Sequence, residues 1–152
     1  MSNAHWFLVF LAVLSMYNCG VIWPTQRVTY PLFHLVAPEQ FLAYHRFYNR
    51  QITAVVIVPG FLSFLAPLGL LAFRPPTVAL WMAVLSAVLG GIALLVTVAL
   101  EIPRHVRLQK QGKSASIIRE LIKYNWLRTA AITAQAILMI WLLIRTFAPI
   151  GT

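Results

Sequence analysis

The stretch TVALWMAVLSAVLGGIALLVTVALEI, residues 77–102, contains a single charged residue, Glu101, close to its end. A helix of about 20 apolar residues crosses the ~30 Å hydrocarbon core of a bilayer, whereas a buried strand has about 4–8 residues. A membrane β-barrel would show short segments of alternating polarity instead. This stretch therefore predicts a transmembrane helix.

Three further runs have the same character: residues 6–23, which end at Pro24, residues 52–73 and residues 129–147. Of the 152 residues, 61% are hydrophobic and 10% are charged, which leaves too few polar side chains to cover a soluble domain. We therefore predict that residues 1–152 form one all-α domain, a bundle of four transmembrane helices in a lipid bilayer.

Polar segments of helical character adjoin the second and fourth runs. Pro38 and Glu39 suit the first turn of a helix, and no breaker separates them from the run at 52–73. Ser116 can cap a helix that continues directly into the run at 129–147. We expect helices 2 and 4 to extend beyond the hydrocarbon at the cytoplasmic face.

The distribution of cations predicts the orientation. The connection between runs one and two holds three of the 12 Lys and Arg residues, and the connection between runs three and four holds seven. Because Lys and Arg favour the cytoplasmic side of a membrane, both connections are predicted to be cytoplasmic and both termini to lie outside. The membrane is predicted to be the inner membrane of a bacterium. The net charge of +9 thus follows from topology and does not indicate a nucleic-acid partner.

Uncommon polar residues cluster at the predicted cytoplasmic face. Glu101 and His105 are four residues apart, although Pro103 between them could end the helix and change their register. Ionisable groups at the edge of hydrocarbon are costly, so they usually pair or take part in chemistry. The predicted site comprises His45, His105, Glu101, Asn125 and Arg128.

The chemistry of these side chains predicts an enzyme that acts on a small apolar molecule, aromatic or quinone-like, which enters from the lipid. His45 and His105 would act as bases or metal ligands, and Glu101 would orient a histidine. Asn125 and Arg128 would stabilise a developing phenolate or enolate oxygen. The sequence does not decide between a transition metal, a haem and no cofactor at this site.

A non-catalytic alternative stays open, as does a haem- or metal-binding protein. In the first, the same polar cluster would lock the loops of a membrane subunit or scaffold, which docks a partner membrane subunit or a second copy. Nothing resembles a phosphate-binding loop, a dinucleotide fingerprint, CxxC or GxSxG.

Four motifs resemble those of a group of small bacterial four-helix membrane proteins: YPLF (30–33), FLAYHRFYNRQITAVVIVPGFL (41–62), EIPRHVRLQKQG (101–112) and LIKYNWLRT (121–129). That group is similar in turn to the anthrone-oxygenase-like membrane proteins, so the resemblance implies an oxidoreductase or oxygenase activity. Close members carry a glutamate soon after the proline of helix 2, whereas this chain has GFLSF at 60–64. The residues that the resemblance implies to be important are Tyr30, Pro31, His45, Pro59, Pro103, His105, Asn125, Trp126, Arg128 and Thr129.

Overall fold

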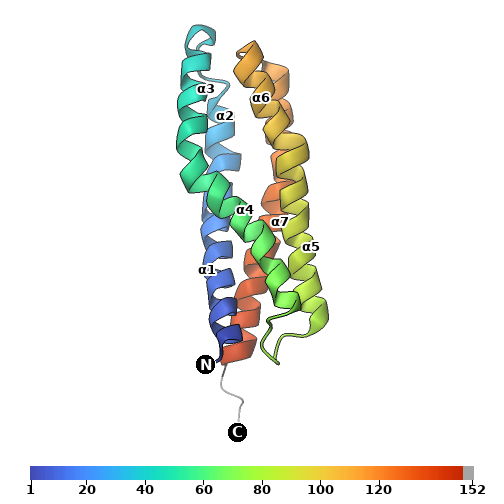
Figure 1. The fold of residues 1–152 in the computed structure, drawn as a ribbon. Helices are drawn as coiled ribbons and strands as arrows, with labels where there is room; N and C mark the ends of the chain where they lie inside the picture. Colours follow the sequence, from blue (N-terminus) through green and yellow to red (C-terminus); the bar gives the residue numbers. More distant parts are fainter. Residues whose placement is uncertain (149–152) are drawn as a thin grey trace.

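The computed structural model describes residues 1–148, which fold into a bundle of helices without strands (Figure 1). In this range four helices are long and apolar enough to cross a membrane: Asn3–Leu32, Pro38–Leu71, Leu80–Gln111 and Ala115–Phe147. The predicted all-α bundle with four membrane-length helices is thereby confirmed, and such a fold is compatible with an integral membrane protein.

Three of the four helices change their winding partway along. The first consists of α1 (Asn3–Pro24), the π-helical η1 (Thr25–Thr29) and α2 (Tyr30–Leu32). The second consists of α3 (Pro38–Ile52), the π-helical η2 (Thr53–Ile57), α4 (Val58–Leu65) and the 3₁₀-helical η3 (Ala66–Leu71). The third consists of α5 (Leu80–Val96), the π-helical η4 (Thr97–Glu101) and α6 (Ile102–Gln111), and the fourth is α7 (Ala115–Phe147).

Each π-helical segment begins at a threonine and is followed by a proline six residues after that threonine. The three stretches are TQRVTYP (25–31), TAVVIVP (53–59) and TVALEIP (97–103). A proline has no N–H to donate, and its ring crowds the preceding turn of an α-helix. A π-helical turn contains one more residue and so makes room for the ring. The threonine hydroxyls donate to the carbonyl oxygens four residues earlier, at 2.9, 3.0 and 2.7 Å. The helices therefore pass their prolines without ending.

This winding overturns one prediction. The first helix does not end at Pro24 but continues to Leu32. Pro103 does not end the third helix either, because it lies in the first turn of α6, where a missing N–H costs little.

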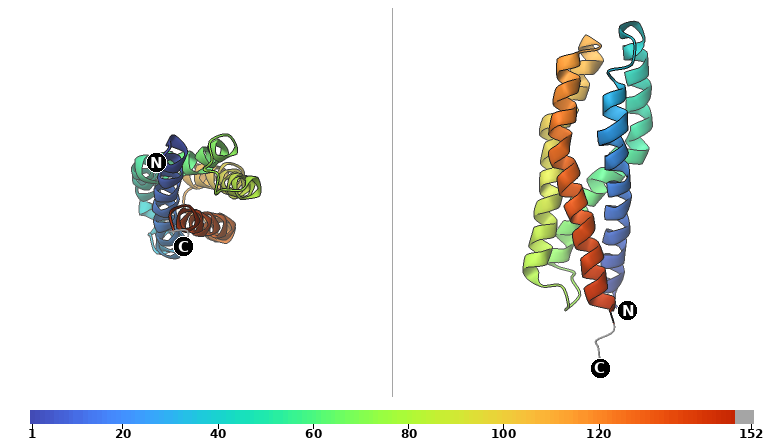
Figure 2. Two further views of the ribbon diagram at one scale, coloured as in Figure 1. Left: turned by 90° about the horizontal axis from the view of Figure 1, so that it is seen from below. Right: turned by 180° about the vertical axis from the view of Figure 1, so that it is seen from behind.

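All four helices are longer than a bilayer requires. At 1.5 Å per residue, helices of 30–34 residues measure about 45–50 Å, compared with the ~30 Å of hydrocarbon. Helices 2 and 4 extend as expected, although Ser114 and not Ser116 precedes the first turn of α7, and helices 1 and 3 extend with them. We call the end with the connections 33–37 and 112–114 the loop end, and the opposite end, where α1 begins and α7 ends, the terminal end (Figure 2).

The second helix crosses the bundle. Near the loop end α3 packs against α6, whereas toward the terminal end α4 packs against α5 and α1 (Figure 1). The approach of α4 to α5 is close because a Cβ at Gly90 would lie only 2.4 Å from the carbonyl oxygen of Phe64. The crossing leaves the loop end of helix 2 free to bring polar side chains toward α6.

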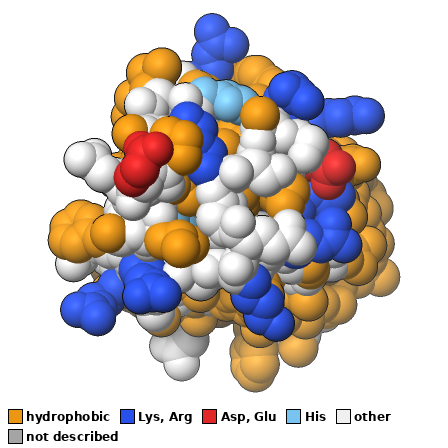
Figure 3. Space-filling model, turned by 90° about the horizontal axis from the view of Figure 1, so that it is seen from above, with side chains coloured by type: hydrophobic (Ala, Val, Ile, Leu, Met, Phe, Trp, Pro, Cys, Tyr) orange, Lys and Arg blue, Asp and Glu red, His pale blue; other side chains and the backbone are white. Residues whose placement is uncertain are grey.

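The two ends of the bundle have different cores. The terminal half is packed with aliphatic residues, among them Leu8, Leu11, Leu70, Met82, Met139 and Leu142. The loop half has a second cluster, in which the aromatic residues Tyr30, Phe33 and Phe41 pack with aliphatic ones. The aliphatic members include Leu108, Ile118 and Leu121. Lys and Arg side chains surround the loop end when it is viewed along the bundle (Figure 3).

Candidate functional site

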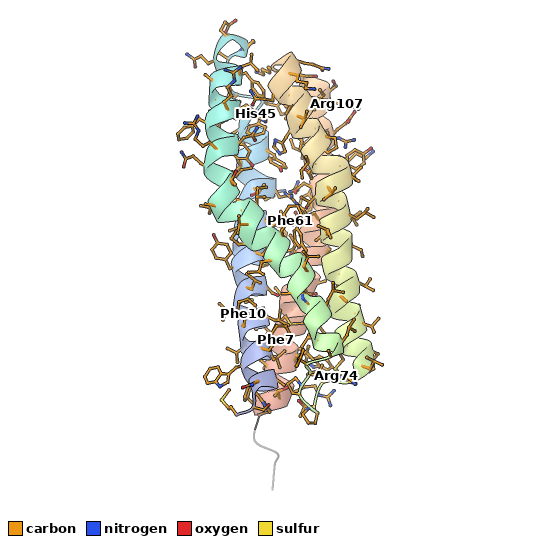
Figure 4. All side chains as sticks on the ribbon, in the orientation of Figure 1. Phe7, Phe10, His45, Phe61, Arg74 and Arg107 are labelled. Carbon is orange, nitrogen blue, oxygen red and sulfur yellow. The ribbon has the colours of Figure 1, made fainter. Side chains whose placement is uncertain are left out.

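The site begins with two histidines that the bundle brings into contact. His45 lies on α3 and His105 on α6, and His45 Nε2 is 3.1 Å from His105 Nδ1. The two rings are stacked, with centroids 5.3 Å apart and planes 21° apart. His45 is completely buried, and it lies near the loop end (Figure 4). The expectation that the two imidazoles meet at one end of the bundle is therefore met.

The histidine pair is part of a longer row of hydrogen bonds. On one side, His105 Nε2 is 3.1 Å from the hydroxyl of Tyr30, which also accepts a hydrogen bond from Arg128 Nη2 at 3.4 Å. On the other side, His45 Nδ1 is 3.1 Å from Gln109 Oε1. Five side chains from all four helices thus form one row, which we call the proton row: Arg128, Tyr30, His105, His45 and Gln109.

One arrangement of hydrogens satisfies the whole proton row, provided that Asn49 Nδ2, which lies 3.3 Å from His45 Nδ1, turns its hydrogens to Gln109 Oε1. Arginine can only donate, and the amide oxygen of Gln109 can only accept. Tyr30 therefore donates to His105 Nε2, His105 Nδ1–H donates to His45 Nε2, and His45 Nδ1–H donates to Gln109 Oε1. Each of the three inner members both accepts and donates, so a proton taken at one end can be replaced from the other.

The Gln109 end of the row lies beside an open pocket. Gln109 Oε1 is 3.1 Å from His45 Nδ1 and 3.5 Å from Asn49 Nδ2, so two N–H groups converge on one oxygen atom. The pocket has a volume of about 370 Å³, and its lining includes Asn49, Ile52, Ile102, His105, Gln109 and Lys110. This volume falls in the range of small-molecule sites, and an apolar wall with a few polar groups is their usual lining.

The Arg128 end of the row holds a buried carboxyl group. Glu101 is 1% exposed, and neither of its carboxyl oxygens has a hydrogen-bond partner. Arg128 donates to Thr97 Oγ1 at 3.3 Å, while its Nε atom has no partner. Both side chains line a small cavity of about 20 Å³, together with Tyr30, Thr97 and His105. Buried polar atoms without partners are rare, so this cavity is expected to hold a polar occupant.

Asn125 makes its contacts away from the histidines. It is fully buried, and its Nδ2 atom donates to Gln26 Oε1 at 2.7 Å. Gln26 Nε2 in turn donates to the carbonyl oxygen of Ile122 at 3.1 Å. These bonds hold η1 against α7. The role of Asn125 beside a substrate oxygen stays a prediction, and Asn49 is the amide that the structure brings to the histidine pair.

No sequence motif pointed to Gln109 or Gln26, yet a signal for the level of the site along the bundle was present. Residues of the three π-helical segments line the cavity beside Glu101, namely Thr25, Val56, Ile57, Thr97 and Glu101 itself. Single π-helical turns are frequent at functional sites. The recurrence of threonine and proline six residues apart in three helices therefore marks the level of the bundle at which the site lies.

The histidine pair offers few ligands for a metal. Catalytic zinc sites use three protein ligands. In residues 1–148 no group of three or more His, Cys, Asp or Glu side chains is placed to hold an ion. Two axial ligands of a haem would lie on opposite sides of its plane, whereas His45 Nε2 and His105 Nδ1 are in hydrogen-bonding contact. The metal, haem and catalytic roles of these histidines all stay predictions.

Comparison with family models, with curated proteins and with solved structures gives no match for this chain. The fold and the site thus define a four-helix bundle of membrane-spanning length with a buried row of Arg, Tyr, His and Gln side chains.

Proposed function

We propose that this chain is a membrane-embedded enzyme that transfers a proton to or from a small apolar molecule with a carbonyl or phenolic oxygen. The substrate would be aromatic or quinone-like, and the proton transfer would be part of an oxidoreductase or oxygenase reaction. The observation that supports the proposal most is the oxygen of Gln109 between His45 Nδ1 and Asn49 Nδ2 at the edge of the open pocket.

In this mechanism the substrate oxygen takes the place of Gln109 Oε1. The two N–H groups of His45 and Asn49 then stabilise the negative charge that develops when the substrate becomes an enolate or a phenolate. His45 can also give its Nδ1 proton to that oxygen, as a general acid. The apolar wall formed by Ile52 and Ile102 would contact the rings of the substrate.

The rest of the proton row replaces the proton that His45 has given up. His45 Nε2 takes the proton of His105 Nδ1, and His105 Nε2 takes the proton of Tyr30. The guanidinium of Arg128, which already donates to the Tyr30 oxygen, stabilises the phenolate that results. The same steps in reverse make His45 a general base.

The setting of the site is consistent with this proposal. The loop end carries most of the cations, so by the positive-inside rule it faces the cytoplasm. The open pocket lies between α3 and α6, where an apolar molecule can enter from the bilayer. The resemblance to anthrone-oxygenase-like proteins implies a substrate of the same kind, an apolar aromatic ketone.

Anthrone in lipid nanodiscs provides a direct test, because its CH₂ group loses a proton to water or to a buffer base and gives an enolate, whose oxygen His45 and Asn49 would bind. In D₂O, the protein should accelerate deuterium uptake at that CH₂ group. The replacement Asn49→Ala should lower the rate about 10²–10³-fold, the usual effect of losing one donor to an oxyanion. The replacement His45→Ala should lower it at least as much. His34→Ala is the matched control, because His34 lies outside the proton row, and its rate should equal that of wild type.

Equal rates for wild type, His45→Ala and Asn49→Ala would contradict the proposal. A transition metal found by elemental analysis and lost in His45→Ala would favour the metal site instead. A partner membrane chain recovered by gentle extraction, with no effect of the protein on anthrone, would favour the non-catalytic subunit.

A further inference from the structure

A line of small cavities continues from Glu101 into the terminal half of the bundle. The first is the cavity of about 20 Å³ beside Glu101 and Arg128. The second, of about 10 Å³, shares Thr97 and Arg128 with the first and also reaches Asn18. The third, of about 10 Å³, shares Asn18 and Phe64 with the second and extends to Gln135. Successive cavities therefore have walls in common.

The polar atoms that lack partners lie along this line. Five buried side-chain atoms in the described part of the chain have no hydrogen-bond partner, and four of them belong to Glu101, Arg128 and Gln135. Glu101 and Arg128 line the first cavity, and Gln135 lines the third. Unpartnered atoms at both ends of a line of cavities indicate that the occupants supply the missing hydrogen bonds.

The walls of each cavity suit water. A buried water molecule needs about 10–15 Å³ of accessible space and two to four polar neighbours. The second cavity offers Asn18, Thr97 and Arg128, and the third offers Ser15, Asn18, Ser63 and Gln135. In the apolar part of the bundle, Asn18 Nδ2 donates to Ser63 Oγ at 2.6 Å and Gln135 Nε2 donates to Ser86 Oγ at 2.8 Å. These pairs leave other polar atoms free to bind water, while no larger ligand fits.

We infer that the three cavities hold a file of single water molecules that connects the carboxyl group of Glu101 with the side chain of Gln135. The file ends there, because the aliphatic cluster around Met82, Met139 and Leu142 closes the terminal end of the bundle. Where the proposed proton transfer occurs, a proton that reaches Tyr30 can be shared with Glu101 and the file. This role as a proton reservoir rests on the proposed function, whereas the presence of the water file does not.

Two glycines supply a matched pair of variants. A Cβ at Gly60 would lie 3.7 Å from the Phe64 ring, which is ordinary van der Waals contact. Gly60 and Phe64 both line the second cavity, so the methyl group of Gly60→Ala should reduce the room for the second water molecule, while its contact with the Phe64 ring is an ordinary one. Gly91 is exposed and a Cβ there would meet nothing within 4 Å, so Gly91→Ala makes the same chemical change outside the file.

The test is nuclear magnetic resonance of the side-chain amides of Asn18 and Gln135, in nanodiscs without substrate. In the wild-type protein both amides should show cross-peaks to water. In Gly60→Ala the cross-peak of Asn18 should weaken or vanish and exchange of the Gln135 amide with D₂O should slow, while Gly91→Ala should match wild type. Absence of both cross-peaks in the wild-type protein would overturn the inference, without any variant. If the Asn18 cross-peak and the exchange of the Gln135 amide are the same in Gly60→Ala as in Gly91→Ala, the inference that water connects the cavities is wrong. Because no substrate is present, these outcomes are independent of the anthrone test.

Discussion

The loop half and the terminal half are built from the same four helices but bury different side chains. The terminal half buries a cluster of Leu, Met, Val and Ala. The loop half buries Glu101, Arg128, Asn125 and His45, together with an aromatic cluster. Buried polar side chains also occur on the terminal side of the π-helical segments, at Asn18, Ser63, Ser86 and Gln135, so the change between the two kinds of core is gradual.

This difference indicates that different forces hold the two halves together. Lipid is as apolar as leucine, so helices within the hydrocarbon associate by close packing and not by the hydrophobic effect. The loop half is held in addition by aromatic packing and buried hydrogen bonds, which lose stability sharply when one partner is removed. Substitutions in the two halves should therefore differ in size and in cause.

The largest effect is expected for Arg128→Met. It removes the donors to Tyr30 and Thr97 and a buried positive charge beside the cavity that Glu101 also lines. Losing two hydrogen bonds from a buried charged donor costs about 3–5 kcal/mol. The control Arg145→Met removes an exposed guanidinium that lies 5.0 Å from the centroid of Trp141, and should cost at most about 1 kcal/mol. The free energy of unfolding in mixed detergent micelles measures both, and equal losses would contradict the distinction between the halves.

The next effect is expected for Leu142→Ala in the terminal half. Leu142 is completely buried, and its truncation leaves a cavity that costs about 2–3 kcal/mol. Ile144 is 59% exposed and would face lipid, so Ile144→Ala should change the unfolding free energy by less than about 0.5 kcal/mol. If the two variants unfold alike, the terminal half is not closely packed.

A smaller effect is expected for Gly90→Ala. The new Cβ would collide with the carbonyl oxygen of Phe64 at 2.4 Å and push α4 from α5. Overpacking costs about 1–3 kcal/mol, of which roughly 1 kcal/mol is regained because alanine is the better helix former. A net loss of about 1 kcal/mol is expected, whereas Gly91→Ala, which has no such collision, should gain up to about 1 kcal/mol. A stable Gly90→Ala protein would mean that the two helices can separate freely.

The smallest effect is expected for Thr133→Val. It removes the hydroxyl that accepts a hydrogen bond from Trp23 Nε1 at 3.2 Å, on a partly exposed face of the bundle. A neutral hydrogen bond contributes about 0.5–1.5 kcal/mol, and an exposed one lies at the low end of that range. Thr133→Ser keeps the hydroxyl and should retain wild-type stability, and a shift of tryptophan fluorescence should accompany the Val variant alone.

The architecture followed from the sequence because the length and polarity of a run decide whether it crosses a bilayer. The meeting of His45 and His105 also followed, since an even number of crossings returns both residues to one face. The hydrogen-bond partners of these histidines, Tyr30 and Gln109, could not be predicted from the sequence. The prediction that Pro24 ends the first helix removed Gln26 and Tyr30 from consideration as helical residues. The contacts of Asn125 depend on helix rotation, which the π-helical segments change by amounts that periodicity does not reveal.

The central claim is that His45 and His105 are linked by a hydrogen bond within one directed row. The most direct measurement is ¹⁵N nuclear magnetic resonance of histidine-labelled protein in lipid, with His5 and His34 replaced to leave only the two site histidines. The account predicts two neutral rings, each protonated at Nδ1, with a scalar coupling between His105 Nδ1 and His45 Nε2 that disappears in His105→Ala. Two uncoupled rings that exchange freely with solvent, or a pair protonated at Nε2, would contradict it.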